Sequence, residues 1–391
     1  MSESSSPPPE QPSLWELALV FLRLGIIAFG GPAAHIALIE EEVVQRRQWL
    51  SREKLLDLLG ITHLLPGPNS TELAIHIGYE RAGLRGLVVA GVCFIAPAMA
   101  VVWLLAAAYT RSQALPQLAW LLYGIKPMII AIVVRALWKL GRTAIQDWVT
   151  AIAAIAVIIA FFLNVNEILL LILAGLGVML SQTWRSTPPN QRFGLWLLPF
   201  TPVVAQTPAS ETITGPGVLA VFWFFLKVGA VLYGSGYVLL AFVQRGLVEQ
   251  YQWLTTQQVL DAVAIGQLTP GPILTTATFI GYLVAGNGGA IAATVGIFLP
   301  AFLLVALVNP WIPKLRRSPW ASAFLRGVNA ASLGLMAVVT LTLAQTSLID
   351  WLTIALAILG AIAVFKLKLN SAWLILISGV IGYLVHFFNL I

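Results

Sequence analysis

The fold of this chain is decided by the sequence Leu64-Leu65-Pro66-Gly67-Pro68, which returns later as Leu268-Thr269-Pro270-Gly271-Pro272. The positions around it repeat as well. Pro66 and Pro270 lie 204 positions apart, and after a one-residue slip Asp147 and Asp350 lie 203 apart. A register kept over roughly 160 residues indicates two copies of one unit.

The composition is typical of a polytopic membrane protein. Of the 391 residues, 59% are hydrophobic and 10% are charged, and the mean hydropathy is +0.89, values that soluble domains do not reach. The net charge of +6 fits Lys and Arg in cytoplasmic loops better than nucleic-acid binding. One cysteine, Cys93, and four scattered histidines offer neither a disulfide nor a metal site. We therefore expect no cofactor, no catalytic residues and no enzyme.

Twelve apolar segments follow one another, six in each half. In the first half they lie at 14–39, 55–78, 84–109, 118–140, 149–163 and 168–180. In the second half they lie at 217–243, 259–284, 290–308, 323–343, 351–365 and 372–390. Lengths near 20 residues suit helices that cross ~30 Å of hydrocarbon. The predicted organisation is a disordered tail at 1–13, a first transmembrane repeat at 14–181, a linker at 182–216 and a second repeat at 217–391.

Loop charges predict opposite orientations for the two halves. In the first half the basic residues follow segments one, two and four, whereas in the second half they follow segments three and five. By the positive-inside rule the repeat is inverted. Both ends of segment two in the first half are basic, so both belong on the cytoplasmic side. Because a helix cannot run through the prolines at 66–68, we interpret this segment as a re-entrant hairpin.

The predicted fold is therefore an all-α polytopic membrane protein. It is an inverted repeat of two homologous halves, with about ten spans and two re-entrant helical hairpins. This count places both termini on the non-cytoplasmic side. The sequence leaves open whether segment one of each half is itself broken at its glycines.

Four helix breaks at membrane depth mark the expected substrate site. Non-helical backbone at this depth is tolerated where it is buried in protein or lines a wet cavity. A helix that restarts after a break directs free N–H groups and partial positive charge to the midplane, which favours an anion. The breaks consist of Gly30, Gly31 and Pro32, of Pro66, Gly67 and Pro68, of Gly234, Ser235 and Gly236, and of Pro270, Gly271 and Pro272.

Hydroxyl and amide residues follow the two proline-rich breaks. They are Asn69, Ser70, Thr71, Thr275 and Thr276. Their side chains have two possible uses, since they either donate to oxygens of a bound anion or cap the helices that they begin.

Arg23 and Lys227 are the candidate cations of the site. Each lies in an apolar run seven residues before its glycine break, and the two are 204 positions apart. A cation at the centre of a membrane helix costs roughly 2.5–3.5 kcal/mol, which favours a functional reason for its presence. The alternative is that both long side chains snorkel to the interface.

Glu72, His35 and His76 are candidate proton carriers. Glu72 aligns with Thr276 and so breaks the symmetry of the repeat. A buried carboxyl without a partner favours its protonated form, which suits a proton carrier. Pairing with Arg23 or with His76 is the alternative for Glu72, and packing is the alternative for the histidines.

Two further sets of charges have simpler interpretations. Asp57 and Asp261 align between the halves, and we interpret them as structural residues that pair or cap at the hairpin bases. The run of Glu40, Glu41 and Glu42 with Arg46 and Arg47 is interpreted as a solvated loop.

These motifs resemble the chromate ion transporter (CHR) family, in its long-chain, two-domain form. The matching features are Phe29-Gly30-Gly31-Pro32 with His35, Trp49-Leu50, both Pro-Gly-Pro sequences, Ile77-Gly78 and Phe279-Ile280-Gly281. The resemblance implies a multi-pass plasma-membrane protein that exports chromate, driven by the proton motive force, and confers chromate resistance, with sulfate as competitor or alternative substrate. The family's usual Phe-Gly-Gly-Gly is replaced here by Tyr233-Gly234-Ser235-Gly236, whose hydroxyls could alter selectivity.

The residues by themselves indicate a tetrahedral oxyanion without choosing between chromate and sulfate. A sulfate or other oxyanion carrier that works in uptake, or an anion channel, therefore stays as an alternative. The expected partners are the oxyanion, protons and the lipid bilayer, without nucleic acid. The sequence leaves a homodimer open.

Overall fold

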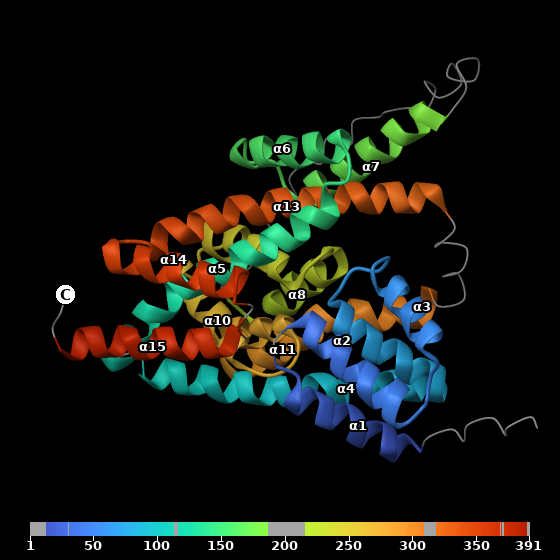
Figure 1. Ribbon diagram of the computed structural model, residues 1–391, viewed down its shortest axis with the longest axis horizontal. Coiled ribbons are helices and arrows are strands. Elements are labelled where there is room, and N and C mark those ends of the chain that lie inside the picture. The colour runs from blue at the N-terminus through green and yellow to red at the C-terminus, as the bar shows by residue number, and fades with distance from the viewer. Residues whose placement is uncertain are drawn as a thin grey trace, which may run out of the picture.

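The computed structural model describes residues 13–29, 31–112, 116–186, 216–308, 318–367, 369 and 371–388. Every regular element in these ranges is a helix (Figure 1). The predicted all-α class is therefore confirmed. Most of the predicted tail at 1–13 and of the predicted linker at 182–216 lies outside the described residues, as does Gly30.

The two halves contain matching series of helices. The first half contains α1 (Leu14–Ile27), α2 (Pro32–Glu40), η1 (Glu41–Arg46), α3 (Arg52–Thr62), α4 (Asn69–Ser112), α5 (Pro116–Ala144), α6 (Trp148–Phe162) and α7 (Glu167–Ser186). The second contains α8 (Val218–Val231), η3 (Gly236–Val238), α9 (Leu239–Val243), η4 (Gln244–Gln250), α10 (Thr256–Leu268), η5 (Ile273–Thr275), α11 (Thr276–Val308), α13 (Pro319–Ser347), α14 (Trp351–Phe365) and α15 (Ser371–Phe387). Even the caps match, because Asp147 and Thr150 form a capping box before α6 as Asp350 and Thr353 do before α14.

Four helices in the described ranges are long and apolar enough to cross a membrane. They are Asn69–Ser112 in α4, Gln117–Ala144 in α5, Ile273–Leu307 in η5 and α11, and Pro319–Ser347 in α13. Shorter apolar helices accompany them, among them α6, α8, α14 and α15. The chain is therefore a multi-pass membrane protein, as its composition predicts.

The helices α4 and α11 each turn back on themselves. The turns lie at Gly83 and at Gly286, where the backbone is not helical. The two arms of α4, residues 69–81 and 84–112, then touch through their backbones, since a Cβ on Gly78 would collide with the carbonyl of Gly86. In each half the first arm belongs to a hairpin and the second arm is the long apolar crossing.

The two Pro-Gly-Pro sequences form the tips of re-entrant hairpins, as predicted. The helix α3 has 11 residues, about 16 Å of helix, which is too short for ~30 Å of hydrocarbon. After the tip at 66–68, the first arm of α4 returns to the side from which α3 entered, because Lys54 and Glu80 form an ion pair of 3.0 Å. The 13-residue α10 and the first arm of α11 repeat this arrangement around the tip at 270–272.

Segment one, predicted as a span at 14–39, is instead a hairpin. The chain leaves α1, passes through Gly31 with a φ of +81°, and restarts as α2 at Pro32. Arg47, which follows η1, forms an ion pair with Glu16 near the start of α1. The two ends of the segment therefore lie together on one side. The break reverses the chain, which the apolar composition of the two legs does not reveal.

The second half has the same reversal. A Cβ on Gly246 in η4 would lie 2.5 Å from the ring of Phe224 in α8. Tyr251, just after η4, also meets Phe224 edge to face, with ring centroids 6.5 Å apart. Because α8 and η4 lie side by side, segment one of the second half is also a hairpin. The prediction of about ten spans wrongly counted segment one of each half as a span.

The halves are inserted in opposite directions. The second arm of α4 begins at the base of the first-half hairpins, where Arg81 donates a hydrogen bond of 3.0 Å to the carbonyl of Trp49. Further along the same arm, Trp103 donates a hydrogen bond of 2.9 Å to Asn287, which directly follows the turn of α11. The hairpin bases of the two halves thus lie at opposite ends of one helix. This arrangement is the inverted repeat that the loop charges predict.

Each half also completes the packing of the other. The helix α5 packs against α14 and α15, while α13 packs against α6 and α7 (Figure 1). Glycines permit the close approach, since a Cβ on Gly124 would collide with the carbonyl of Ser378, and one on Gly327 with that of Ala174. The two repeats are therefore interlocked, and the breaks in their helices are brought to a common centre.

The hairpin in segment one has a direct test. In a Cys93→Ser background, single cysteines replace Trp15, near the start of α1, and Gln45 in η1, both of which are exposed. Because Glu16 and Arg47 hold these two ends together, a membrane-impermeant maleimide added to one side should label both variants. Labelling from opposite sides would restore segment one as a span.

Candidate functional site

A pair of crossed hydrogen bonds holds the tips of the two Pro-Gly-Pro hairpins. The amide of Gly67 donates to the carbonyl of Leu232 at 2.9 Å, and the amide of Gly271 donates to that of Ala28 at 2.8 Å. Ala28 and Leu232 are the residues at which α1 and α8 end. Each tip therefore binds the broken helix of the other half, and the breaks predicted from the sequence meet in one place.

Glycine is required at both tips. Gly67 has a φ of +144° and Gly271 a φ of +90°, which residues with a Cβ rarely adopt. A Cβ on Gly271 would also lie 2.7 Å from that of Ala98 in α4, and a Cβ on Gly67 would lie 2.5 Å from Oε1 of Glu72. The tips are thus wedged tightly among the helices that surround them.

A small cavity of about 20 Å³ lies beside the second tip. Residues of both halves line it, among them Gly31, Pro32, Tyr237, Gln267, Gly271 and Ile273. A cavity of this size holds about one water molecule. The conformation is therefore closed, and a tetrahedral oxyanion needs the tips to separate before it can bind here.

Two helix N-termini reach this cavity without a side-chain cap. They belong to α2, which begins at Pro32, and to η5, which begins at Ile273 and leads into α11. The first N–H groups of a helix have no partner within it and carry partial positive charge. Gln267 donates a hydrogen bond of 2.7 Å to the hydroxyl of Tyr237, so polar side chains also reach the cavity. These groups suit a bound anion.

The residues after the proline-rich breaks are buried, but they differ in their partners. Ser70, Thr71, Thr275 and Thr276 are at most 2% exposed. The hydroxyl of Thr275 donates to the carbonyl of Pro272 at 2.8 Å. This hydrogen bond lies within its own turn, as expected of a residue that stabilises the start of a helix. The hydroxyl of Thr71, by contrast, has no hydrogen-bond partner among the described residues.

Asn69 and Ser235 are engaged locally as well. Asn69 contacts Nδ1 of His63 at 3.0 Å. The hydroxyl of Ser235 accepts a hydrogen bond of 3.4 Å from the amide of Tyr237. In this closed conformation both side chains contribute to the local structure of their breaks.

Arg23 and Lys227 lie outside the group of residues that meet at the tips. Both are exposed, whereas the buried faces of α1 and α8 carry apolar residues such as Phe21 and Phe225. The structure therefore does not bring these two cations to the tip cavity. An exposed position allows the snorkelling alternative.

Glu72 is enclosed at the first tip. It is 0% exposed, and neither of its carboxyl oxygens has a hydrogen-bond partner among the described residues. Both ring nitrogens of His76 also lack one there, and no ion pair joins Glu72 to Arg23 in the described chain. The pairing that the sequence left open as an alternative is therefore absent from this conformation.

A buried cluster that contains histidines and a carboxyl lies in the first half, without a counterpart at the aligned described positions of the second. Nδ1 of His35 lies 3.2 Å from the hydroxyl of Ser70, and Thr71, Glu72 and His76 follow Ser70 along the same buried arm of α4. At the positions equivalent to His35, Ser70 and His76 the second half has leucine, leucine and isoleucine, all buried. The symmetric fold thus carries an asymmetric set of side chains.

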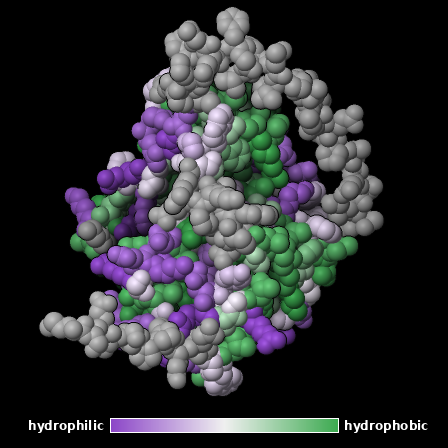
Figure 2. All heavy atoms as spheres, turned by 90° about the vertical axis from the view of Figure 1, so that its right-hand side faces the viewer, coloured by the Kyte–Doolittle hydropathy of each residue, from purple (hydrophilic) through white to green (hydrophobic). Residues whose placement is uncertain are grey.

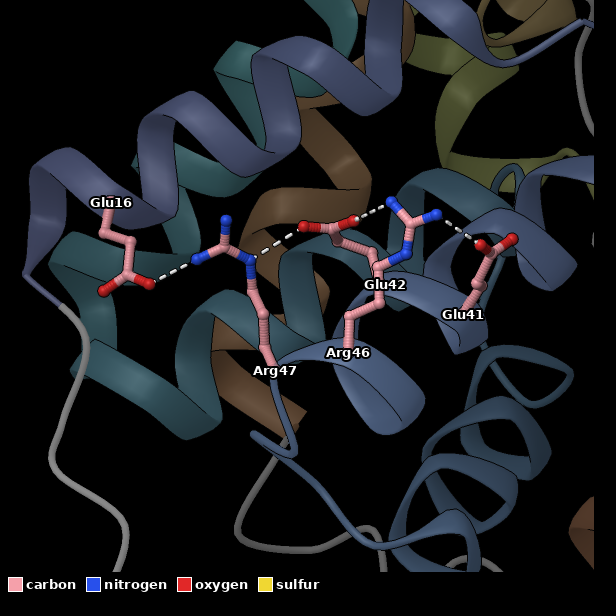
Figure 3. A network of polar contacts seen from close by, with 5 residues as sticks. All are labelled: Glu16, Glu41, Glu42, Arg46 and Arg47. Carbon is pink, nitrogen blue, oxygen red and sulfur yellow. Dashed lines mark hydrogen bonds and ion pairs between the residues drawn. The ribbon is translucent and has the colours of Figure 1, made fainter.

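The charged run after α2 is a network of ion pairs and not only a solvated loop (Figure 3). Nε of Arg47 lies 2.8 Å from Glu42, and Arg47 also pairs with Glu16. Arg46 reaches Glu41 at 2.8 Å and Glu42 at 3.6 Å. We name these five residues the charged clasp. It joins α1 to η1 and so closes the base of the first hairpin.

The charged clasp has an aromatic counterpart in the second half. There Tyr251 stacks on Trp253, with ring centroids 4.9 Å apart, and Phe224 contacts Tyr251. Figure 2 faces the end of the molecule at which α3 lies and shows hydrophilic residues gathered there beside a hydrophobic flank. The two hairpin bases are therefore closed by different forces, ion pairs on one side and aromatic packing on the other.

The sequence did not predict the buried ion pair between Lys126 and Asp261. Asp261, interpreted as structural, lies 3.3 Å from Nζ of Lys126 in α5 and accepts a hydrogen bond of 2.7 Å from Tyr109. Lys126 lies in a long apolar run, and the equivalent position in the second half is Asn329. That loss of symmetry is the signal that could have singled out Lys126, as it did Glu72. Tyr237 and Gln267 show the same signal, since they align with Ala33 and His63.

The chain is similar to known chromate transport proteins. A sequence profile described as "Chromate transporter" matches residues 15–179 and 219–383. The chromate transport protein of Cupriavidus metallidurans is 32% identical over 380 residues, which cover 96% of this chain and 94% of the relative. The probable chromate transport protein of Synechococcus elongatus is 32% identical, with 95% of each chain covered. The chromate transport protein of Pseudomonas aeruginosa is 31% identical, with 98% and 94% covered.

No solved structure shows significant similarity to this chain. The two matched segments of the profile correspond to the two structural repeats, α1 to α7 and α8 to α15.

The wedged tip leads to a prediction about stability. Gly271→Ala should lower the midpoint of thermal unfolding in detergent, because the new Cβ must enter a positive-φ conformation and meet Ala98. Strain of this kind costs about 1–3 kcal/mol. Gly60→Ala in α3 is the matched control, since a Cβ there meets nothing within 4 Å. Equal midpoints for the two variants would contradict the description of the tip.

Proposed function

This chain belongs to the chromate transporter family, and from that premise we propose that it is a secondary transporter that exports chromate across the plasma membrane. The proton motive force drives the export and sulfate competes for the site, so the protein confers chromate resistance. The observation that carries the proposal is the meeting of both hairpin tips with the broken helices of the opposite halves, through Gly67 and Gly271.

The proposed substrate site is the tip cavity. Its uncapped helix N-termini, at Pro32 and Ile273, offer partial positive charge at membrane depth and the remaining N–H donors of their first turns, since Pro32 has no N–H and the amides of Ala34 and Thr275 already donate to Gly31 and Pro272. Discontinuous helices in inverted repeats build the sites of many secondary transporters. Chromate and sulfate are both tetrahedral dianions, so such donors bind either and discriminate only modestly between them.

The closed cavity favours a carrier over a channel. At about 20 Å³ it is too small for a tetrahedral anion, and it can admit one only when the tips separate. Separation exchanges two backbone hydrogen bonds, of Gly67 and Gly271, for contacts with the anion. Each such bond contributes only about 1 kcal/mol net, so a bound dianion can compensate for their loss. Transport then saturates with substrate, as expected of a carrier.

The membrane potential supplies part of the driving force. Moving one charge across 100 mV is worth about 2.3 kcal/mol, so an exported dianion gains about 4.6 kcal/mol at a potential that is negative inside. Export therefore needs no chemical energy source beyond the proton motive force. Uptake of the same dianion would need coupled cations, which distinguishes export from the alternative of a sulfate importer.

Glu72 is the proposed proton carrier. Its carboxyl has no partner and is enclosed beneath the first tip, and burial of an isolated ionised carboxylate is costly. An ionised Glu72 would also repel a dianion at the tips. We expect the anion to bind when Glu72 is neutral, so that proton binding and anion binding are linked. A proton that leaves with the anion reduces the net exported charge to one, for which the membrane potential still supplies about 2.3 kcal/mol per 100 mV. His35 and His76 are the neighbouring groups through which a proton reaches it.

The first experiment measures transport itself. Inside-out vesicles energised by respiration should accumulate labelled chromate, and an uncoupler should stop the accumulation because it collapses the driving force. Excess sulfate should reduce the initial rate. If chromate does not accumulate but sulfate enters right-side-out vesicles, the protein is a sulfate importer. Flux that does not saturate would identify a channel.

A second experiment tests the role of Glu72. Glu72→Gln should keep the protein inserted and folded, because glutamine has nearly the same shape, but the chromate flux should no longer depend on pH. Glu53→Gln is the matched control, since Glu53 is exposed on the neighbouring helix α3. An unchanged pH dependence in Glu72→Gln would remove Glu72 from the proton pathway.

A further inference from the structure

A second cavity lies apart from the tips. It has a volume of about 380 Å³, and its lining includes Trp120, Tyr123, Lys126, Gln257, Ser347 and His386. At roughly 30 Å³ per water molecule, this outer cavity has room for an oxyanion with part of its hydration shell. The tip cavity does not.

The lining of the outer cavity is basic. Lys126 and His386 contribute to it, and no aspartate or glutamate occurs among its described lining residues. Two acids contact the lining residues from outside the cavity, and both already have partners. Asp261 pairs with Lys126, and Asp350 accepts a hydrogen bond of 2.6 Å from the hydroxyl of Tyr123. An anion that enters the cavity therefore meets donors and no bare carboxylate.

Lys126 can turn from its partner Asp261 to an anion in the cavity. Its side chain is 12% exposed, and its ammonium group contacts Oδ1 of Asp261 at 3.3 Å. An ammonium group has three N–H donors, so this contact leaves donors for a second acceptor. Asp261 also keeps the hydrogen bond from Tyr109 to its other oxygen. It is therefore not left without a partner when Lys126 turns toward an incoming anion.

The two cavities lie at opposite ends of one helix pair. Gln257 at the start of α10 and His386 near the end of α15 line the outer cavity. Gln267 near the end of α10 and Ser371 at the start of α15 line the tip cavity. The two helices pack against each other (Figure 1), and the ten residues from Gln257 to Gln267 correspond to about 15 Å. Asp261, one turn after Gln257, lies between the cavities.

Only one side of the molecule has this cation. The position equivalent to Lys126 in the second half is Asn329, although Asp57 repeats Asp261. The side chain of Asn329 approaches Gly234, since a Cβ there would lie 3.0 Å from its Oδ1. The lysine thus lies at the base of the second-half hairpin, and the position equivalent to it has the neutral amide of Asn329.

We propose that the outer cavity is a second anion site, a vestibule that binds a tetrahedral oxyanion through Lys126 between the aqueous phase and the tips. The Lys126–Asp261 ion pair closes the vestibule at rest and opens when the anion replaces Asp261 as the partner of Lys126. This inference rests on the proposed function, because it names an access site for the same cargo.

The test uses sulfate as the probe, since it is a tetrahedral dianion that does not oxidise thiols. The full-length protein with Cys93→Ser carries a single cysteine at Thr346, an exposed residue of the vestibule wall. Sulfate should slow the reaction of this cysteine with an anionic thiosulfonate reagent in purified protein at constant ionic strength. A cysteine at Thr143, exposed at the far end of α5, is the matched control and should show no protection.

Charge variants then identify the ligand. Lys126→Gln should raise the sulfate concentration for half-protection about tenfold or more, since a hydrogen bond to a charged group is lost. Lys139→Gln, an exposed lysine on the same helix, should leave it unchanged. The double variant Lys126→Gln with Asp261→Asn removes both charges together, so that no buried charge is left unpaired, and it should also lose protection. Asp261→Asn alone should strengthen protection.

The outcomes separate the vestibule from the proposed function. Absence of protection in the parent, or equal protection in the parent and the double variant, would overturn the vestibule even if the protein transports chromate. Protection that depends on Lys126 in a protein without chromate flux would support the vestibule as an anion site and remove the proposed function.

Discussion

The structure depends on the crossed hydrogen bonds between the hairpin tips and the ends of the broken helices. A Pro-Gly-Pro tip exposes backbone groups at a depth where no water can satisfy them. The amides of Gly67 and Gly271 find their partners in carbonyls that are free because α1 and α8 stop. The amide at each tip therefore donates to the free carbonyl at the helix end in the other half. This exchange explains why the two halves cannot be separated without leaving buried polar groups unpaired.

The same contacts combine stability with mobility. Two backbone hydrogen bonds contribute only a few kcal/mol at most, whereas the long helices pack extensively against their neighbours, α11 against α8 and α4 against α1 among them. The tips can therefore move while the long helices keep their contacts. The bases of the hairpins are closed by other contacts, the charged clasp on one side and Tyr251 with Trp253 on the other. Because ion pairs weaken with salt and aromatic packing does not, the two sides respond differently to their surroundings.

The two halves have matching backbones but different side chains at their hairpins. An inverted repeat provides equivalent gates toward the two sides of the membrane. The side chains that line those gates do not follow the symmetry of the backbone. Here Glu72 and the buried histidines His35 and His76 lie in the first half, whereas the buried Asp261 of the second half pairs with Lys126 of α5. The two hairpin regions therefore differ in their buried ionisable side chains although their backbones match.

The sequence by itself determined that helices exist, where they break and that the unit is repeated and inverted, because proline, glycine and loop charge act locally. It also singled out Glu72, since a repeat makes any departure from symmetry visible. Only the tertiary structure decided that segment one reverses at Gly31 and that Arg23 faces outward. The direction in which a chain leaves a break, and the face that a helix buries, are set by contacts such as Arg47 with Glu16 and Gly271 with Ala28. Those contacts join residues far apart in the chain, so no local pattern contains them.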